Sequence, residues 1–246
     1  GKKVREFEKE FAKFVGTDKC VTMNSGTSAL LLSLQTLMNP AIKNPVKKGD
    51  EVITVALAFP SSINAIIQNG LVPVFVDVEP STYNMDPSLI ERMMTNRTKA
   101  ILVVHHLGNP CMMDEIMEIA KKHSLYVIED CADAHGSLFQ GKHVGTFGDM
   151  GCFSFYVAHA MTMGGEGGAV VFNNPAYEPI LKSLKACGRA CVCDVCKVSI
   201  DPNYQCPIRM DSSNMDKRAL YLNIGHKSRI LEVQAAFGLE QLKKLP

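Results

Sequence analysis

The sequence predicts an α/β fold, with a mostly parallel sheet covered by helices on both faces. Short apolar runs of strand length alternate with longer amphipathic stretches, and this alternation is typical of parallel strands joined by crossover helices. The 246 residues are enough for one large domain with a substantial core. No apolar run approaches the ~20 residues of a membrane-spanning helix. The net charge of +1, without a basic run, argues against nucleic acid or a membrane surface as a partner.

The elements follow from local patterns along the chain. An amphipathic helix opens it, with Val4, Phe7 and Phe11 at helical spacing, and Gly16 ends this helix. Asp86 caps a later helix whose first turn holds Pro87. Strands are expected at 20–23, 51–56, 73–78, 100–104, 126–130 and 151–155, and further helices at 24–37, 61–69, 114–123 and 230–245.

Three segments are expected from these patterns. Residues 1–186 form a large α/β domain, 187–218 a cysteine-rich loop, and 219–246 a last segment that contains the final helix. The chain opens directly into a helix without a signal peptide, so we expect a cytoplasmic protein whose nine cysteines are thiols or metal ligands. Four cysteines are scattered and expected to be buried, and five fall within twenty residues: Cys187, Cys191, Cys193, Cys196 and Cys206.

The stretch 153–171 is the most informative part of the chain. It is interpreted as a short strand, an irregular loop and a second strand. The loop holds one imidazole, His159, and then four glycines within 164–168, a density that lets backbone approach a ligand closely. Alone, the same pattern is equally typical of a glycine-rich hairpin with an incidental histidine.

Other polar or aromatic residues follow predicted strands. Ligands of parallel sheets bind at the carboxyl ends of the strands. The segment 24–27, Phe59, Asp130 and His159 all lie just beyond a strand end. We therefore expect these four segments to face one crevice.

Each of these residues suits a phosphorylated heteroaromatic ligand. Ser25, Gly26 and Thr27 open a helix, whose first N–H groups and dipole favour phosphate, although Ser-Gly-Thr is also an ordinary N-cap. Phe59 can stack on a flat ring, although a core phenylalanine is the more usual interpretation of this residue in isolation. Asp130 can keep a pyridine nitrogen protonated, as in pyridoxal phosphate enzymes. Ser154 can donate its hydroxyl to the phosphate.

Four blocks together carry a family resemblance: residues 24–29, 128–130, 144–149 and 153–156. They resemble the sugar aminotransferase-like (DegT/DnrJ/EryC1/StrS) family of fold-type-I pyridoxal phosphate enzymes. The resemblance implies that residues 1–186 are a cofactor-binding large domain of the fold-type-I transferase-like kind. It also implies that 219–246 start the connection to the family's small C-terminal domain, which is missing from this chain. It implies that Asp133 also contacts the cofactor. Ordinary members carry a lysine where this chain has His159, and an imidazole cannot form the lysine's covalent link to the cofactor.

The histidine narrows the resemblance to the nucleotide-sugar 3-dehydratases, nearest to those acting on CDP-4-keto-6-deoxy-glucose. Segments 67–79, 107–110, 162–163 and 166–168 fit this subgroup. It implies pyridoxamine phosphate held noncovalently, a nucleotide-linked 4-keto-6-deoxyhexose as substrate, and loss of the C3 hydroxyl in a deoxysugar or lipopolysaccharide pathway. His159 would be the base, a task that suits an imidazole near neutral pH.

The cysteine-rich loop resembles the iron–sulfur segment of the same subgroup. The resemblance implies a [2Fe–2S] cluster on Cys191, Cys193 and Cys206, fed with electrons by a partner reductase. The fourth ligand is expected to be Cys131 or Cys196, because the family's ligand, two residues after the cofactor aspartate, is replaced here by Ala132. With Cys131 as ligand, the loop would fold back beside Asp130. A structural zinc site is the alternative, since four thiolates also suit zinc.

The late segment 225–227 bears on assembly and on the remaining alternatives. Lys227 stands where the family has an asparagine that contacts cofactor phosphate, in relatives from the neighbouring subunit, so we expect a homodimer. An inserted Gly165 and the altered cysteine spacing also depart from the family. They leave open a cluster-free deaminating dehydratase, a sugar aminotransferase relative, or a non-catalytic metal-binding scaffold.

Overall fold

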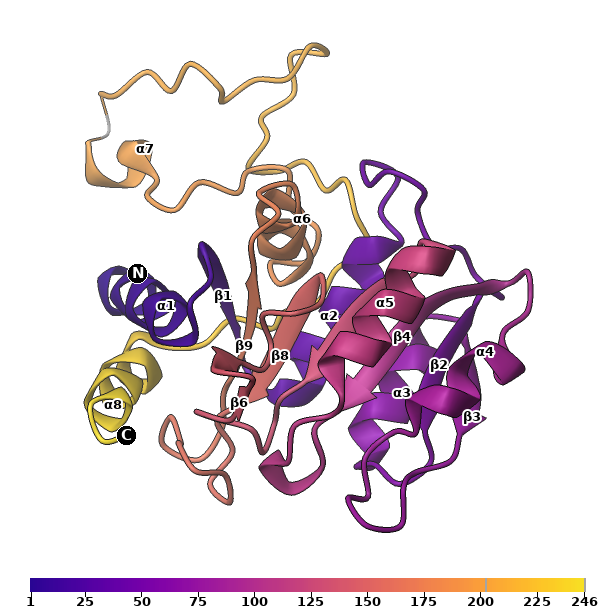
Figure 1. Ribbon diagram of the computed structural model, residues 1–246. Helices are drawn as coiled ribbons and strands as arrows, with labels where there is room; N and C mark the ends of the chain where they lie inside the picture. Colours follow the sequence, from indigo (N-terminus) through magenta and orange to yellow (C-terminus); the bar gives the residue numbers. More distant parts are fainter. Residues whose placement is uncertain (202, 246) are drawn as a thin grey trace.

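A seven-stranded sheet organises the computed structural model, which describes residues 1–201 and 203–245 (Figure 1). The strand order is β1-β9-β8-β5-β4-β2-β3. Only β9 runs antiparallel to its neighbours, β1 and β8, so the predicted, mostly parallel sheet is confirmed. The strands are β1 (Lys19–Met23), β2 (Glu51–Val55), β3 (Val72–Val76), β4 (Thr98–Val104), β5 (Tyr126–Asp130), β8 (Met150–Ser154) and β9 (Gly168–Phe172).

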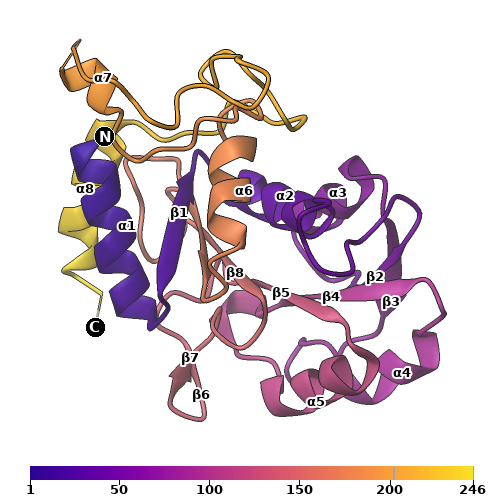
Figure 2. The same cartoon turned by 90° about the horizontal axis from the view of Figure 1, so that it is seen from above.

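Helices cover both faces of the sheet, as predicted (Figure 2). On one face lie α2 (Gly26–Leu37), α3 (Pro60–Gln68) and α6 (Tyr177–Leu184), and on the other α4 (Ile90–Met93) and α5 (Met113–His123). The pair α1 (Lys2–Val15) and α8 (Glu232–Leu242) packs beside the β1 and β9 edge. Among the described residues, none of the helices combines the length and apolar character needed to cross a bilayer.

The alternation of side chains along the strands explains the two faces. In β5, Val127 packs into the cluster that contains residues of α5, whereas Ile128 packs into the cluster that contains residues of α2 and α6. Both side chains are fully buried, as expected for a strand that is covered on both faces. The sheet therefore holds its polar strand ends in fixed positions.

Two glycines allow the elements around the crevice to approach each other. A Cβ at Gly26 would lie 2.6 Å from Cβ of Ser154, and a Cβ at Gly168 would lie 2.2 Å from the carbonyl oxygen of Ser25. Glycine is thus required where α2 begins against β8 and β9. Ser25 caps α2 by accepting a 3.1 Å hydrogen bond from the N–H of Ser28.

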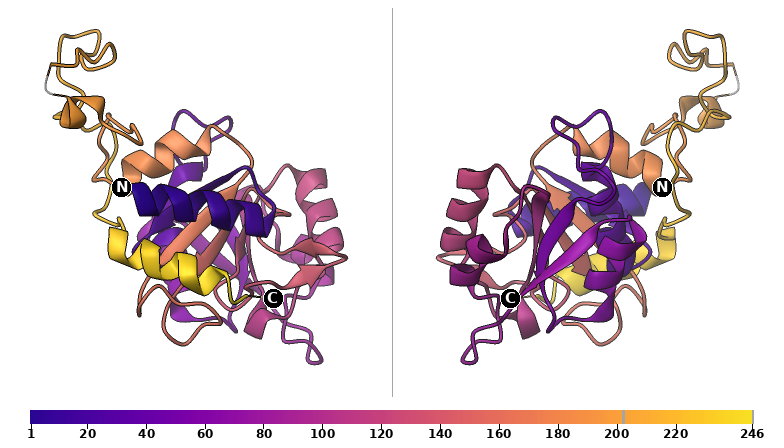
Figure 3. Two further views of the ribbon diagram at one scale, coloured as in Figure 1. Left: turned by 90° about the vertical axis from the view of Figure 1, so that its left-hand side faces the viewer. Right: turned by 90° about the vertical axis from the view of Figure 1, so that its right-hand side faces the viewer.

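Some elements differ from the sequence prediction. The final helix is shorter than expected, and a small hairpin of β6 (Leu138–Phe139) and β7 (Lys142–His143) was not predicted, nor was α6. The 187–228 segment, called the arm here, projects from the body beyond α6 (Figure 3). Hydrogen bonds from Ala190 N–H to the Leu220 carbonyl and from Cys191 N–H to the Lys217 carbonyl join its two sides. The arm also contains the short helix α7 (Lys197–Ile200).

Candidate active site

A cavity of about 500 Å³ opens where α2 begins and where β5 and β8 end. The four segments expected to face one crevice all contribute to it. The predicted site residues that line it are Ser25, Gly26, Thr27, Phe59, Asp130, Asp133, Ser154 and His159. Lys227 is not among its lining residues; it lies exposed on the return of the arm, in a β-bridge with Ala186.

His159 is held by a carboxylate. Its Nδ1 lies 2.7 Å from Oδ1 of Asp133. Because a carboxylate can only accept, Nδ1 carries the proton and Nε2 is the nitrogen with a free lone pair in the neutral ring. The His159 side chain is 17% exposed. The pair therefore presents a fixed basic nitrogen in a partly sheltered site.

Asp130 is a second, more deeply buried carboxylate in the cavity. Its Oδ2 accepts a 2.6 Å hydrogen bond from the Ser62 hydroxyl, and its Oδ1 accepts from the N–H of Ala132 at 3.1 Å. Burial raises the pKa of Asp130 above its usual value, although these two hydrogen bonds oppose the rise. A cationic ring nitrogen placed against this carboxyl would offset the cost of burying its charge.

The remaining lining residues supply a phosphate site and a ring face. The first turn of α2 points its N-terminal end at the cavity beside Ser154, which favours an anion there. Phe59 is 76% exposed, so it is not the core phenylalanine of the simpler interpretation. It also lines a neighbouring hollow of about 320 Å³, which shares Asp130 and Asp133 and adds His106. The donor set fits a flat, phosphorylated, cationic heterocycle such as pyridoxamine phosphate.

Among the described residues, no lysine lines the cavity or the neighbouring hollow. The described lining of the cavity therefore offers the imidazole of His159 and no lysine amine. Sequence reasoning missed the lining residues Ser61 and His106, because no motif marks them. Ser62 lies one turn into α3, and only the folded chain brings it to Asp130.

A second imidazole lies behind the pair. The ring centroid of His135 is 6.4 Å from that of His159 and 5.6 Å from those of Phe153 and Phe155. Both of its ring nitrogens are buried without a hydrogen-bond partner among the described atoms. Burial, followed by the charge of His159, lowers the pKa of His135 to about 4, so this ring is neutral at pH 7.

Glu129 anchors the turn that follows β7. Its carboxylate accepts hydrogen bonds from the N–H groups of Gly145 (2.6 Å), Phe147 (2.8 Å) and Gly148 (2.7 Å). It also contacts His105 Nε2 at 3.1 Å. These contacts of Glu129 fix the end of β5, where Asp130 is the next residue.

Cys131 does not lie with the cysteines of the loop. It is fully buried beside Phe153 and Gly145, and its thiol contacts the Glu129 carbonyl at 3.8 Å. The loop cysteines Cys191, Cys193, Cys196 and Cys206 line a hollow in the arm that does not include Cys131. The expected return of the loop beside Asp130 is therefore wrong, because the chain after Cys187 leaves the body as the arm.

Comparisons with known proteins show which family and which individual proteins this chain resembles. The profile described as the DegT/DnrJ/EryC1/StrS aminotransferase family matches residues 1–246. The lipopolysaccharide biosynthesis protein RfbH of Salmonella typhimurium is 44% identical over 241 residues, covering 97% of this chain and 55% of that protein. The dTDP-4-dehydro-2,6-dideoxy-D-glucose 3-dehydratase of Saccharopolyspora spinosa is 44% identical over 252 residues, covering 100% of this chain and 53% of that protein.

A solved structure shows the same fold. The GDP-4-keto-6-deoxymannose-3-dehydratase ColD, crystallised as a His-to-Asn mutant with bound GDP-perosamine, superposes with a TM-score of 0.84 at 33% identity. The match covers 100% of this chain and 61% of that one. The chain spans about half the length of the curated relatives it matches.

Proposed function

Because this chain belongs to the DegT/DnrJ/EryC1/StrS aminotransferase family, we propose that it is the cofactor-binding part of a nucleotide-sugar 3-dehydratase. The substrate is a nucleotide-linked 4-keto-6-deoxyhexose, and the cofactor is pyridoxamine 5′-phosphate. One observation carries the proposal: His159, paired with Asp133, lines a cofactor-type cavity in which none of the described lining residues is a lysine.

Different residues of the cavity bind different parts of the cofactor. The first turn of α2, through Ser25, Gly26 and Thr27, holds the phosphate together with Ser154. Asp130 holds the ring nitrogen in its protonated form, and Phe59 covers one ring face. When bound, the cofactor supplies an electron sink for the bond changes at the sugar.

His159 moves the proton. With the cofactor and sugar bound, Nε2 of His159 would accept a proton from a carbon of the bound ligand, while Asp133 would stabilise the resulting imidazolium and fix the ring orientation. The C3–O bond of the sugar then breaks, and hydroxide leaves as water once it gains a proton. In the balanced overall reaction, two electrons and two protons enter, and the C3 hydroxyl is replaced by hydrogen.

The cysteines of the arm would hold a [2Fe–2S] cluster, which would supply these electrons one at a time from a partner reductase. The cysteine content of the arm supports this part, since thiolates are the usual ligands of such clusters. The homodimer is part of the same proposal, because Lys227 is placed outside the cavity of its own chain, where it could serve a neighbour's phosphate.

The test uses the full-length protein loaded with pyridoxamine phosphate. We expect release of water from C3 of the nucleotide-linked 4-keto-6-deoxyhexose, and no cofactor fixed to any lysine after borohydride treatment of the pyridoxal phosphate form. His159→Asn should abolish the dehydration, whereas Ala160→Ser, one residue away, should not. A lysine-linked cofactor would instead favour the sugar aminotransferase function for which the family is named.

A cluster-free deaminating dehydratase is the second candidate. The open arrangement of the arm cysteines supports it, since no three of their sulfur atoms among the described residues lie within 4.8 Å of one another. The two candidates separate in a product assay with an added one-electron donor: the cluster-dependent reaction needs the donor and leaves the amino group on the cofactor, whereas the deaminating reaction needs no donor and releases ammonia.

A further inference from the structure

The arm gathers cysteines that are distant in sequence. The N–H of Cys191 donates to the Lys217 carbonyl, and the N–H of Lys217 donates to the Arg209 carbonyl. The N–H of Arg209 then donates to the Cys206 carbonyl. This ladder brings Cys206 next to the Cys191–Cys193 segment, although fourteen residues separate Cys191 from Cys206 in the sequence.

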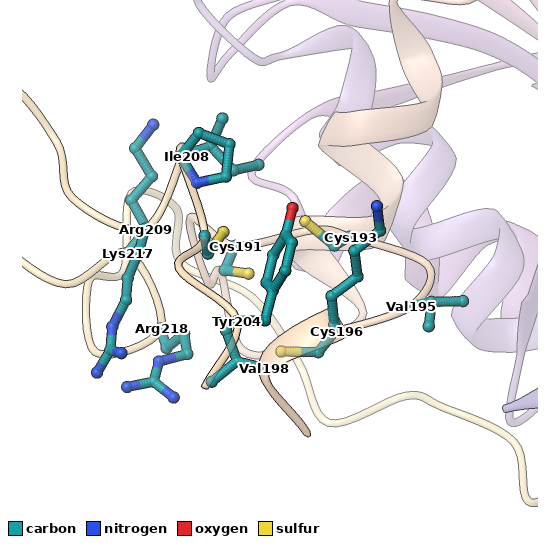
Figure 4. A pocket seen from close by; sticks show the side chains of 13 residues that line it. Cys191, Cys193, Val195, Cys196, Val198, Tyr204, Ile208, Arg209, Lys217 and Arg218 are labelled. Carbon is teal, nitrogen blue, oxygen red and sulfur yellow. The ribbon is translucent and has the colours of Figure 1, made fainter. Parts of the chain in front are cut away.

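Cys196 faces the same hollow as the other three. The hollow has a volume of about 240 Å³, and its lining includes all four of these cysteines. Figure 4 shows the sulfur atoms of Cys191, Cys193 and Cys196 around the ring of Tyr204. Only Cys187 among the cysteines of the arm lies outside the lining, and it is exposed.

The charge of the hollow suits anionic sulfur. Lys197, Arg209, Lys217 and Arg218 line it, and no carboxylate is among its described lining residues. Metal-bound thiolates carry net negative charge, which nearby cations stabilise. Arg209 and Arg218 both pair with the carboxylate of Asp216, at 2.9 and 2.7 Å.

Cys131 cannot join this set without unfolding the core. Its N–H donates to the Cys152 carbonyl at 2.8 Å, which extends the pairing of β5 with β8. Its sulfur lies 3.2 Å from the position that a Cβ on Gly145 would take, so the turn anchored by Glu129 packs directly on it. Cys131, His105 and Glu129 do approach one another within 4.8 Å, but the carboxylate is already saturated by the three N–H groups and the imidazole.

We propose that Cys191, Cys193, Cys196 and Cys206 form a complete four-thiolate metal site within the arm, with Cys196 as the fourth ligand. The site differs from the family pattern described above, in which the fourth ligand follows the cofactor aspartate. This site would hold the iron–sulfur cluster of the proposed function, and the identity of the bound metal rests on that function. Among the described residues, no three of these sulfurs lie within 4.8 Å of one another, so metal binding draws the arm together around the position of Tyr204.

Metal analysis of the full-length protein after anaerobic reconstitution with iron and sulfide tests the site. We expect about two irons and two sulfides per chain, with a visible chromophore. Cys196→Ser should lose most of the metal. Cys131→Ala and Cys187→Ser should keep it. Retention of metal by Cys196→Ser, or its loss from Cys131→Ala in a protein that still binds cofactor, would overturn the proposal.

A second measurement needs no substitution. Thiol alkylation followed by peptide mass analysis, with and without metal, should show that metal protects these four cysteines and leaves the labelling of Cys187 unchanged. Equal labelling of Cys196 with and without metal would contradict the proposal. One zinc per chain that is lost in Cys196→Ser supports the four-thiolate site and overturns the iron–sulfur part of the proposed function.

Discussion

His159 Nδ1 lies 2.7 Å from Asp133 Oδ1, so the imidazole in the cavity is oriented by a carboxylate three residues beyond Asp130. Asp133 remains about half exposed, with 48% of its side-chain surface accessible. Two carboxylates on one segment thus have different surroundings. The buried Asp130 suits a ring cation, and the exposed Asp133 suits an imidazole that gains and loses a proton.

Asp133→Asn should lower kcat by roughly 100-fold while leaving KM for the sugar nearly unchanged. The amide keeps the shape but can donate to Nδ1, which stabilises the tautomer with its proton on Nε2. Steady-state kinetics of the full-length enzyme measure this. Asp114→Asn, an exposed acid of α5, is the matched control. An equal effect of both substitutions would show that the pair does not orient the base.

Asp130 should make the cofactor-free protein less stable as the pH rises. Its folded pKa is raised by burial, so below the unfolded value of about 3.9 both states are protonated and the group contributes nothing. Above that pH, the folded state keeps a proton that the unfolded state has lost, and stability falls until the folded pKa is passed. The stability of cofactor-free Asp130→Asn relative to wild type should therefore increase between pH 4 and pH 7, as measured by urea unfolding. A constant difference over this range would contradict it.

His135 should have the opposite pH dependence. Its folded pKa of about 4 is below the usual value of 6.5, so the unfolded state binds more protons between these values and stability falls as pH drops through this window. The full loss is about 3 kcal/mol. Both ring nitrogens of His135 lack a hydrogen-bond partner among the described atoms. The substitution His135→Leu should therefore reduce the loss of folding stability between pH 7 and pH 4.5. Calorimetric melting at pH 7 and 4.5 measures it, with His226→Gln, on the exposed return of the arm, as the control.

Much of the fold follows from local signals. Gly16 ends α1 in a left-handed conformation, Ser25 caps α2, and Tyr126–Asp130 forms a strand with the predicted limits. These features depend on residues within a few positions of each other. The hairpin of β6 and β7 was missed because each strand has only two residues, too few to show alternation.

The site residues that follow strand ends could be predicted from the sequence, whereas the positions of residues that depend on tertiary packing could not. The gathering of the 24–27 segment, Asp130 and His159 follows from the parallel topology. The position of Cys131 does not, because a one-residue shift along the segment after β5 turns the thiol into the core. Ser62 reaches Asp130 only because α3 packs over that strand end, which no local pattern records.

Gly26→Ala should weaken cofactor binding. The added Cβ would lie 2.6 Å from Cβ of Ser154, and both atoms belong to short, rigid segments. The first turn of α2 must therefore shift from β8, which separates the phosphate ligands. We expect the dissociation constant of pyridoxamine phosphate to rise at least about tenfold, or 1.4 kcal/mol, in equilibrium dialysis. Ser88→Ala, on the opposite face of the sheet, should leave it unchanged, and unaltered affinity in Gly26→Ala would place the phosphate elsewhere.

His159→Lys should restore the covalent attachment that ordinary members of the family use. Residue 159 lines the cavity together with Asp130 and Ser154, so a lysine there has an amine within reach of a cofactor held by those groups. The long side chain also keeps its charge in contact with Asp133. Borohydride treatment of the pyridoxal phosphate form should then fix one cofactor per chain on residue 159, identified by peptide mass analysis, while the wild type gains none. Dehydration should be lost, because an amine committed to the cofactor is no longer a free base. Attachment to a different lysine in the variant, or attachment in the wild type, would mean that the cofactor does not sit against His159.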